Sequence, residues 1–192
     1  GAWLKVNYPL EYYTTVFGYY EGDMERTNKL TEELNYFGIK LKSVQFGRSS
    51  GKYQINREEN AIYKSIGSIK YNNSEIGDQL YEMRNTHFDS LIDFLNVSPL
   101  NSRQLDILVK LDFFKNQFGG SLKLLKIIDL YNTLHGKKQI KKEKATIPTE
   151  VLSQYCLSET EKMYKFDDEH MNAMLADLCN RIPDQSIPLQ TK

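Results

Sequence analysis

Cysteines and long apolar runs are scarce in this sequence of 192 residues, and its charges cancel. The two cysteines, Cys156 and Cys179, lie far apart without CxxC spacing, so neither a disulfide framework nor a zinc motif is indicated. A reduced, cytoplasmic setting is therefore expected. No apolar run approaches the roughly 20 residues that span a bilayer. No signal peptide is expected at the start, and we expect no membrane partner.

The balance of charge limits how the chain finds a partner. The sequence has 25 Lys and Arg residues against 25 Asp and Glu residues, so its formal net charge is zero. No global field then draws the molecule to nucleic acid or to a membrane surface. Binding of either kind must come from a local patch.

The side chains that usually catalyse reactions or bind metals follow no known pattern. His87, His135 and His170 stand apart from one another, and Cys156, His170 and Cys179 lack the usual ligand spacing. No nucleophile–base pair, glycine-rich nucleotide loop or zinc signature is present. We therefore predict no catalytic residue, no metal and no cofactor in this chain.

Three other patterns allow both a functional and a structural interpretation. Asp167-Asp168-Glu169 suits metal-assisted chemistry, but acids at a helix N-terminus are also explained by the helix dipole. The lysines crowded between Lys137 and Lys144 can touch phosphates or form a solvated arm. A set of tyrosines at helical spacing can stack on bases or belong to a core: Tyr12, Tyr13, Tyr19 and Tyr20.

Helix signals dominate the first part of the chain, which opens on Gly1 instead of Met. We expect a piece of a longer protein, with Gly1 as a cleavage scar. Pro9 predicts a helix start, because proline is tolerated in the first turn, and an apolar stripe at helical spacing follows it. Asp23 is the expected N-cap of a second helix, which Gly38 closes. Residues 40–46 are expected as a strand or an extended link.

A β-hairpin and a series of short helices are expected next. Residues 52–56 and 61–64 flank a polar turn, which predicts the hairpin. Ser74 is the expected cap of the following helix. Asn101 with Gln104 resembles a capping box at the start of another helix.

The last third of the chain is also expected to be helical. Gly119-Gly120-Ser121 precedes a long apolar-periodic segment. After the lysine-rich stretch, Ser158-Glu159-Thr160-Glu161 has the pattern of a capping box. Asp167 is the expected cap of a final helix.

Several segments, taken together with their order and spacing, point to a family. They are Ala2-Trp3-Leu4-Lys5, Tyr8-Pro9-Leu10-Glu11-Tyr12, Phe37-Gly38-Ile39, Ile66-Gly67-Ser68-Ile69-Lys70, Phe88-Asp89-Ser90-Leu91-Ile92-Asp93-Phe94, Leu100-Asn101-Ser102-Arg103-Gln104-Leu105, Phe113-Phe114 and Phe118-Gly119. This series resembles the late part of the alpha subunit of bacterial DNA polymerase III, a C-family replicative polymerase. The resemblance covers roughly residues 2–135.

The resemblance implies a fold and an arrangement of parts. In that family this region is the end of the fingers followed by a tandem helix-hairpin-helix domain, which binds the duplex behind the polymerase. The expected fold is mainly α with a small β-hairpin and a tandem helix-hairpin-helix module. The expected parts are a helical, fingers-like region (1–50), the tandem module (51–135), a lysine-rich linker (136–147) and a C-terminal helical segment (148–192).

The chain departs from the family at both hairpins. The family has Gly-Val-Gly where this chain has Tyr71-Asn72-Asn73, and Ala-Gly-Ala-Phe where it has Leu111-Asp112-Phe113-Phe114. Glycines there admit positive φ and let backbone amides approach a phosphate. Asn tolerates a left-handed conformation, whereas the Tyr71 ring can block the approach and Asp112 places a negative charge where a phosphate would lie. The family's proline-containing link is also missing around residues 44–46.

Two functions follow from these observations. The first is a non-catalytic piece of a polymerase III alpha subunit, a nucleotidyltransferase whose catalytic aspartates lie upstream. Its partners would be double-stranded DNA, the rest of the alpha subunit and other replisome proteins. The predicted phosphate contacts are Lys64, Lys70, Asn72, Asn73, Ser74 and Arg103. The alternative, favoured by Tyr71 and Asp112, is a degenerate scaffold that docks proteins or neighbouring domains without binding DNA.

Overall fold

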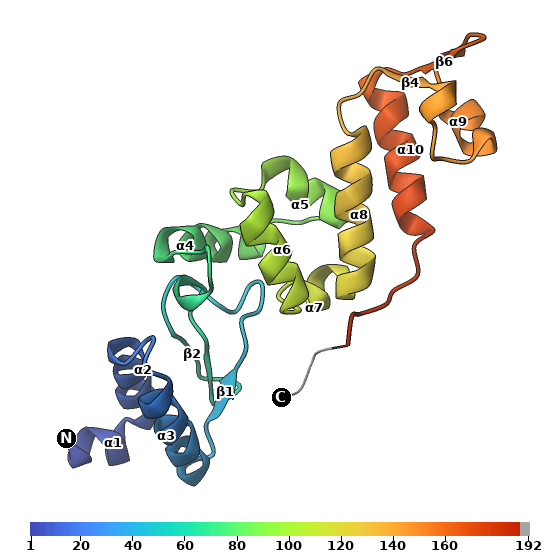
Figure 1. Cartoon of the computed structure of the whole chain (residues 1–192). Coiled ribbons are helices and arrows are strands. Elements are labelled where there is room, and N and C mark those ends of the chain that lie inside the picture. Colours follow the sequence, from blue (N-terminus) through green and yellow to red (C-terminus); the bar gives the residue numbers. More distant parts are fainter. Residues whose placement is uncertain (189–192) are drawn as a thin grey trace.

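The structure is a computed structural model that describes residues 1–188. The elements follow one another along an elongated molecule, from α1 at one end to α9 and the second sheet at the other (Figure 1). The α-helices are α1 (Ala2–Asn7), α2 (Pro9–Tyr19), α3 (Met24–Leu34), α4 (Ser74–Glu82), α5 (Leu91–Val97), α6 (Ser102–Lys110), α7 (Lys115–Phe118), α8 (Ser121–Leu134), α9 (Thr149–Tyr155) and α10 (Asp168–Asn180).

Short strands and 3-10 turns connect these helices. The strands are β1 (Lys40–Lys42), β2 (Gln54–Asn56), β3 (Ala61–Tyr63), β4 (Gln139–Lys141), β5 (Ser158–Glu159) and β6 (Met163–Lys165). The 3-10 turns are η1 (Asn35–Phe37), η2 (Ile66–Ser68), η3 (Met83–Asn85) and η4 (Lys142–Lys144). The expected class, mainly α with a little β structure, is confirmed.

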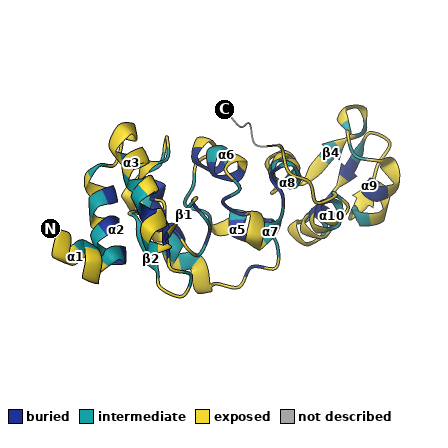
Figure 2. Cartoon of the chain, turned by 90° about the horizontal axis from the view of Figure 1, so that it is seen from below, coloured by how far each residue is buried: buried dark blue, intermediate teal, exposed yellow. Residues whose placement is uncertain are grey.

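The first helices begin and end as their sequence predicts. Pro9 is the first residue of α2, and the Asp23 side chain caps α3 by accepting a hydrogen bond from the Arg26 amide at 3.1 Å. Gly38 follows η1 with φ of 64°, a left-handed conformation that suits glycine. Figure 2 shows α1 exposed along its length, and none of its residues is buried.

The tyrosine-rich stripe of α2 faces inward only in part. Tyr13 and Phe17 are fully buried and form a small core, together with four other buried residues: Leu10, Leu34, Ile39 and Ile62. The Tyr13 hydroxyl donates to Glu33 at 2.8 Å, and burial raises the pKa of Tyr13. Tyr19 is 80 % exposed. The core interpretation therefore holds for Tyr13, whereas Tyr19 projects into solvent.

The expected β-hairpin is present and has a third strand beside it. β2 pairs antiparallel with β3, in the register Ile55 opposite Ile62. β1 pairs with β3 in parallel, so the strand order is β1-β3-β2. β3 is buried along its whole length because it is the central strand. This small sheet joins the first helices to the rest of the chain.

A second, larger core begins after the sheet and continues to α10. Phe46, Phe94, Phe113 and Phe114 lie at its centre, with ring centroids 5.0 Å apart for Phe94 and Phe114. The expected capping box of α6 is confirmed: the Asn101 amide donates to Gln104 at 2.9 Å, and the Gln104 amide donates to Asn101 at 2.9 Å. No helix within residues 1–188 has both the length and the apolar composition required to cross a bilayer.

The C-terminal part differs from its prediction in two places. Residues 136–147, expected as a linker, contain strand β4, which pairs antiparallel with β6. Residues 158–161, expected as a capping box, instead contain β5, the third strand of the same sheet, in the order β4-β6-β5. Hydrogen bonds to distant β6 decide both segments, and local sequence does not reveal such partners. How the chain divides into domains stays a prediction.

The last helix packs back onto the middle of the molecule. Asp167 caps α10 by accepting from the His170 amide at 2.7 Å, as predicted. Met171, Met174 and Leu175 are fully buried in the same core as Leu124 of α8. The segment after α10 then runs back to the start of α8, where the Asp184 carboxylate accepts from the Gly120 amide at 2.7 Å. The Gln185 carbonyl there accepts from the amide of Leu122 at 3.0 Å.

Candidate nucleic-acid interface

The first hairpin turn, residues 69–73, connects η2 to α4. Its backbone is closed by hydrogen bonds from the Ile69 amide to the Ile66 carbonyl at 3.1 Å and from the Asn72 amide to the Ile69 carbonyl at 3.0 Å. Tyr71 has a φ of 68°, in the left-handed region. This is the position where a glycine would be unstrained, so the turn keeps the geometry without the glycine.

Asn73, and not Ser74, caps α4. The Asn73 side chain accepts a hydrogen bond from the Ile76 amide at 2.9 Å. Ser74 is the first residue of the helix, and its hydroxyl lies against Gly67, where an added Cβ would come within 2.9 Å of it. The prediction was one residue late because Asn and Ser are both good caps and stand side by side here.

The start of α4 leaves main-chain donors open. Within residues 1–188 the amides of Ser74 and Glu75 have no hydrogen-bond acceptor. Amides at the start of a helix, with the helix dipole behind them, favour an anion such as phosphate. The α4 terminus therefore presents donors next to the first hairpin turn.

Two cationic side chains gather around the Tyr71 ring. The Lys70 ammonium lies 5.1 Å from the ring centroid, and the Arg103 guanidinium carbon lies 5.5 Å from it, each within cation–π range. Gln104, at the start of α6, donates to the Tyr71 carbonyl at 3.0 Å. The Tyr71 ring is half-exposed and lies beside both cations.

The structure brings together some of the predicted contact residues and not others. Lys70 and Arg103 meet at Tyr71, although they lie far apart in sequence. Asn72 donates from its side chain to the Lys70 carbonyl at 3.1 Å and so supports the turn. Lys64 is exposed after β3, and within residues 1–188 no hydrogen bond, ion pair or cation–π contact joins its ammonium to this cluster.

The contacts of Tyr71 and Gln104 with other elements are not evident from the sequence alone. Tyr71 was named as a ring that can block the approach of a phosphate, and the structure adds that Lys70 and Arg103 both lie within cation–π range of it. Gln104 belongs to the capping box of α6 and is 7 % exposed. Its side-chain amide also donates a hydrogen bond to the Tyr71 carbonyl in the first hairpin turn. The capping pattern was visible in the sequence, but the second use of the same side chain depends on tertiary packing.

The second hairpin turn, residues 111–114, ends α6 in a Schellman motif. The Phe113 amide donates to the Leu108 carbonyl at 3.1 Å, and the Asp112 amide donates to the Val109 carbonyl at 3.1 Å. Asp112 takes the left-handed position with φ of 62°. Both hairpin turns thus keep a left-handed residue at the place where the resemblance expects glycine.

The second turn is unfavourable for an anion. One carboxylate oxygen of Asp112 is buried and has no hydrogen-bond partner within residues 1–188. Asp112 lines an open hollow of about 360 Å³ together with Lys42 and Lys115. Lys42 is engaged by Glu59 at 3.0 Å, and this contact holds the pKa of Glu59 below its ordinary value of 4.5. The first hairpin turn therefore lies beside two cations, whereas the second contains a carboxylate and lies beside a lysine that is already paired.

The Cys179 thiol is buried in α10. Burial raises the pKa of the Cys179 thiol to about 11, so the thiol stays protonated at neutral pH. Within residues 1–188 no group of three or more His, Cys, Asp and Glu side chains is placed to hold a metal ion.

Comparison with known proteins gives two similarities. Residues 38–122, which include both hairpin turns, match a family model described as a helix-hairpin-helix motif. The chain is also 30 % identical over 152 residues to the DNA polymerase III subunit alpha of Chlamydia muridarum (strain MoPn / Nigg). That similarity covers 76 % of this chain and 12 % of the relative, so the chain spans about an eighth of its length.

Proposed function

We propose that this chain binds duplex DNA non-specifically, through phosphates, as a non-catalytic part of a replicative polymerase alpha subunit. The observation that carries the proposal is the meeting of Lys70 and Arg103 at Tyr71, next to the open amides of α4. The helix-hairpin-helix match and the similarity to a polymerase III alpha subunit support it. The rest of the alpha subunit and other replisome proteins are the proposed further partners.

The expected affinity for duplex DNA is modest. Main-chain amides and two cations suit one or two phosphates of a duplex backbone and carry no sequence information. Glu75 in the first turn of α4 opposes them with one negative charge. Because the second hairpin turn contributes an acid instead of a cation, we expect an affinity in the non-specific range, with a Kd of roughly 10⁻⁴ to 10⁻⁶ M at physiological salt.

The first prediction removes both cations of the cluster. The variant Lys70→Gln/Arg103→Gln should bind a duplex about tenfold more weakly, by the same factor for different sequences. The slope of log affinity against log salt should flatten by about 1.8, because each phosphate contact on B-DNA contributes roughly 0.9. Fluorescence anisotropy titrations at two or more salt concentrations measure both quantities.

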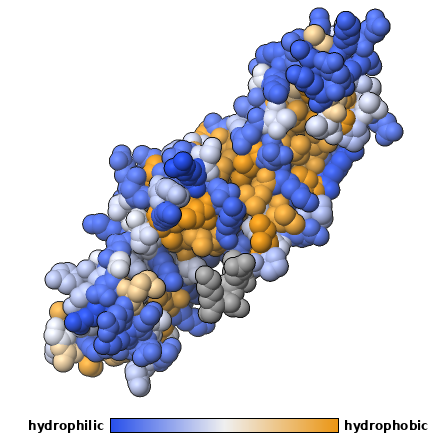
Figure 3. All heavy atoms as spheres, viewed as in Figure 1, coloured by the Kyte–Doolittle hydropathy of each residue, from blue (hydrophilic) through white to orange (hydrophobic). Residues whose placement is uncertain are grey.

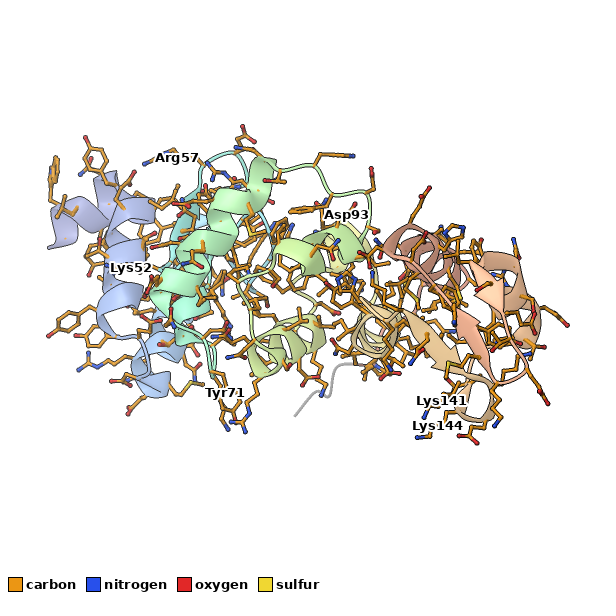
Figure 4. All side chains as sticks on the ribbon, turned by 90° about the horizontal axis from the view of Figure 1, so that it is seen from above. Lys52, Arg57, Tyr71, Asp93, Lys141 and Lys144 are labelled. Atoms are coloured by element: carbon orange, nitrogen blue, oxygen red, sulfur yellow. The ribbon has the colours of Figure 1, made fainter. Side chains whose placement is uncertain are left out.

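The matched control removes two charges elsewhere. Lys52 and Arg57 are exposed, Arg57 forms an ion pair with Glu11, and Figure 4 shows Arg57 on the edge of the molecule opposite Tyr71. Lys52→Gln/Arg57→Gln should therefore bind as the parent does. Equal binding by the parent and the Lys70/Arg103 variant would show that these residues do not hold the duplex.

A second function is favoured by an apolar surface. Figure 3 shows apolar residues gathered over the middle of the molecule, where α6 and α8 lie in Figure 1. A groove of about 310 Å³ between these helices is lined by Leu100, Leu105, Leu125 and Ile128, among others. Such a surface suits docking of a protein or a neighbouring domain. A parent chain that binds no duplex at any salt concentration would favour this function.

A further inference from the structure

We propose that Lys137, Lys141 and Lys144 form a second phosphate-binding site, which contacts the backbone of the same duplex. The proposal rests on the proposed function, because it takes duplex DNA as the ligand. It assigns a role to the lysine-rich stretch, which forms strand β4 and turn η4 in the structure.

The three lysines converge on one hollow of the surface. A cavity of about 250 Å³ at the end of α8 is lined by Lys137, Lys141 and Lys144, with Thr133 and Thr146 beside them. Lys141 is the last residue of β4 and Lys144 is the last residue of η4, and both line this cavity. A solvated arm would spread its charges apart, whereas this fold gathers them.

The other two lysines of the stretch form ion pairs with carboxylates. Lys138 forms an ion pair with Asp168, and Lys142 pairs with Glu159 at 2.6 Å. Within residues 1–188 no carboxylate lies within 4.0 Å of the ammonium groups of the three lysines that line the cavity. The fold therefore leaves unpaired the same three cations that it brings together.

Phosphate is the ligand that this site suits. Lysine binds phosphate as a compact point charge, and Thr146 in the same lining can add a hydroxyl donor, whereas the Thr133 hydroxyl donates to the Asp129 carbonyl at 2.8 Å. Glu143, in the same turn, lines the neighbouring hollow with Lys141 and Lys162 and not this one. The lining of the cavity thus contains three cationic and no anionic side chains among the described residues.

The site lies on the same edge of the molecule as the first hairpin turn. Figure 4 shows Tyr71, Lys141 and Lys144 projecting from one long edge, while Arg57 projects from the opposite one. DNA is a stiff rod on this scale, with a persistence length of about 150 base pairs. One straight duplex along that edge can therefore meet the Tyr71 cluster and the lysine site together.

The test is a duplex titration with the variant Lys141→Gln/Lys144→Gln. The ligand is a duplex of about 24 base pairs, roughly 80 Å long at 3.4 Å per pair. The variant should bind about tenfold more weakly and lose about 1.8 from its salt slope. Lys141→Arg/Lys144→Arg keeps both charges and should bind as the parent does, and thermal unfolding checks that each variant is folded.

The outcomes separate this site from the first one. A normal salt slope for Lys141→Gln/Lys144→Gln, with weakened binding by Lys70→Gln/Arg103→Gln, would overturn the lysine site and leave the proposed function standing. If Lys141→Gln/Lys144→Gln binds more weakly while Lys70→Gln/Arg103→Gln binds as the parent does, the lysine site is supported and the Tyr71 cluster does not contact the duplex. No binding by the parent would overturn both.

Discussion

At the scale of single residues, the most informative feature is the pair of left-handed residues in the two hairpin turns. Tyr71 and Asp112 have φ values of 68° and 62°. A residue with a Cβ in this region costs about 1–2 kcal/mol, less for Asp or Asn than for Tyr. Such conformations persist where the surroundings enforce them. Here the Schellman hydrogen bonds fix Asp112, and the hydrogen bond from the Gln104 side chain to the Tyr71 carbonyl fixes Tyr71.

Asp112→Gly should therefore make the protein more stable. Glycine adopts positive φ without strain, and the substitution also removes a buried carboxylate oxygen that has no partner. Against this stands the greater backbone entropy of glycine in the unfolded chain, about 0.5–1 kcal/mol. We expect a net gain of about 1 kcal/mol, measured as a higher urea midpoint with an unchanged m-value.

Asp112→Ala is the matched comparison. Alanine also removes the carboxylate but keeps a Cβ in the left-handed region, so it should be about 1–2 kcal/mol less stable than the glycine variant. Equal stability of the two variants would mean that the backbone strain at this turn is no larger than the entropy cost of glycine, about 0.5–1 kcal/mol.

At the scale of elements, the start of α8 depends on a segment far away in sequence. The Gly120 amide is capped by Asp184, and the Ser121 hydroxyl accepts from the Ile187 amide at 2.8 Å. An added Cβ on Gly120 would lie 2.2 Å from the Gln185 carbonyl oxygen. Glycine is needed here for close approach of two backbones, since its own φ of −68° is ordinary.

Gly120→Ala should displace the segment after α10. Loss of about two capping hydrogen bonds predicts a destabilisation of about 2 kcal/mol, seen in urea unfolding, and faster proteolysis after residue 182. Gly18→Ala is the control, because an added Cβ there meets nothing within 4 Å. In α2 that change should stabilise by up to about 1 kcal/mol through helix propensity. An unchanged urea midpoint for Gly120→Ala would show that the contact contributes little.

Local signals in the sequence were enough for most helices and for the hairpin of the first sheet, but not for the second sheet. The caps Asp23, Asn101 and Asp167 act on amides within three residues, so their patterns predict the helix starts. β4 and β5 are three and two residues long, too short to show alternation, and both depend on β6. The lysine stretch therefore looked like an arm.

Only part of the candidate site could be predicted from the sequence. Lys70 and Arg103 were chosen from charge and resemblance, and the structure brings them to one ring. Lys64 was chosen on the same grounds and stays outside the cluster. No local pattern separates these lysines, because the direction of each side chain depends on how η2 and α6 pack.

At the scale of the whole molecule, the described chain has two separate cores. The smaller one holds six buried residues from α2, α3, β3 and the link before β1, whereas the larger one runs from Val44 to Cys179. Burial of apolar area is the main source of stability. The two ends of the molecule should therefore differ in resistance to unfolding.

Native-state hydrogen exchange should show this difference. We expect amides of α2 and α3 to exchange through a partial opening of lower free energy than amides of α6, α8 and α10, which should require global unfolding. Exchange measured over a series of low denaturant concentrations tests the prediction. A single opening free energy for all five helices would mean that the two cores unfold as one unit.

The contact between Asp184 and the start of α8 has an electrostatic consequence. A helix of 14 residues that begins after two glycines is ordinarily a good receptor for a free anion. Here the chain supplies its own counter-ion, so the positive pole of α8 is already satisfied from within. In the proposed function, the attraction for duplex DNA therefore comes from the edge that carries Tyr71, Lys141 and Lys144 and not from the start of α8.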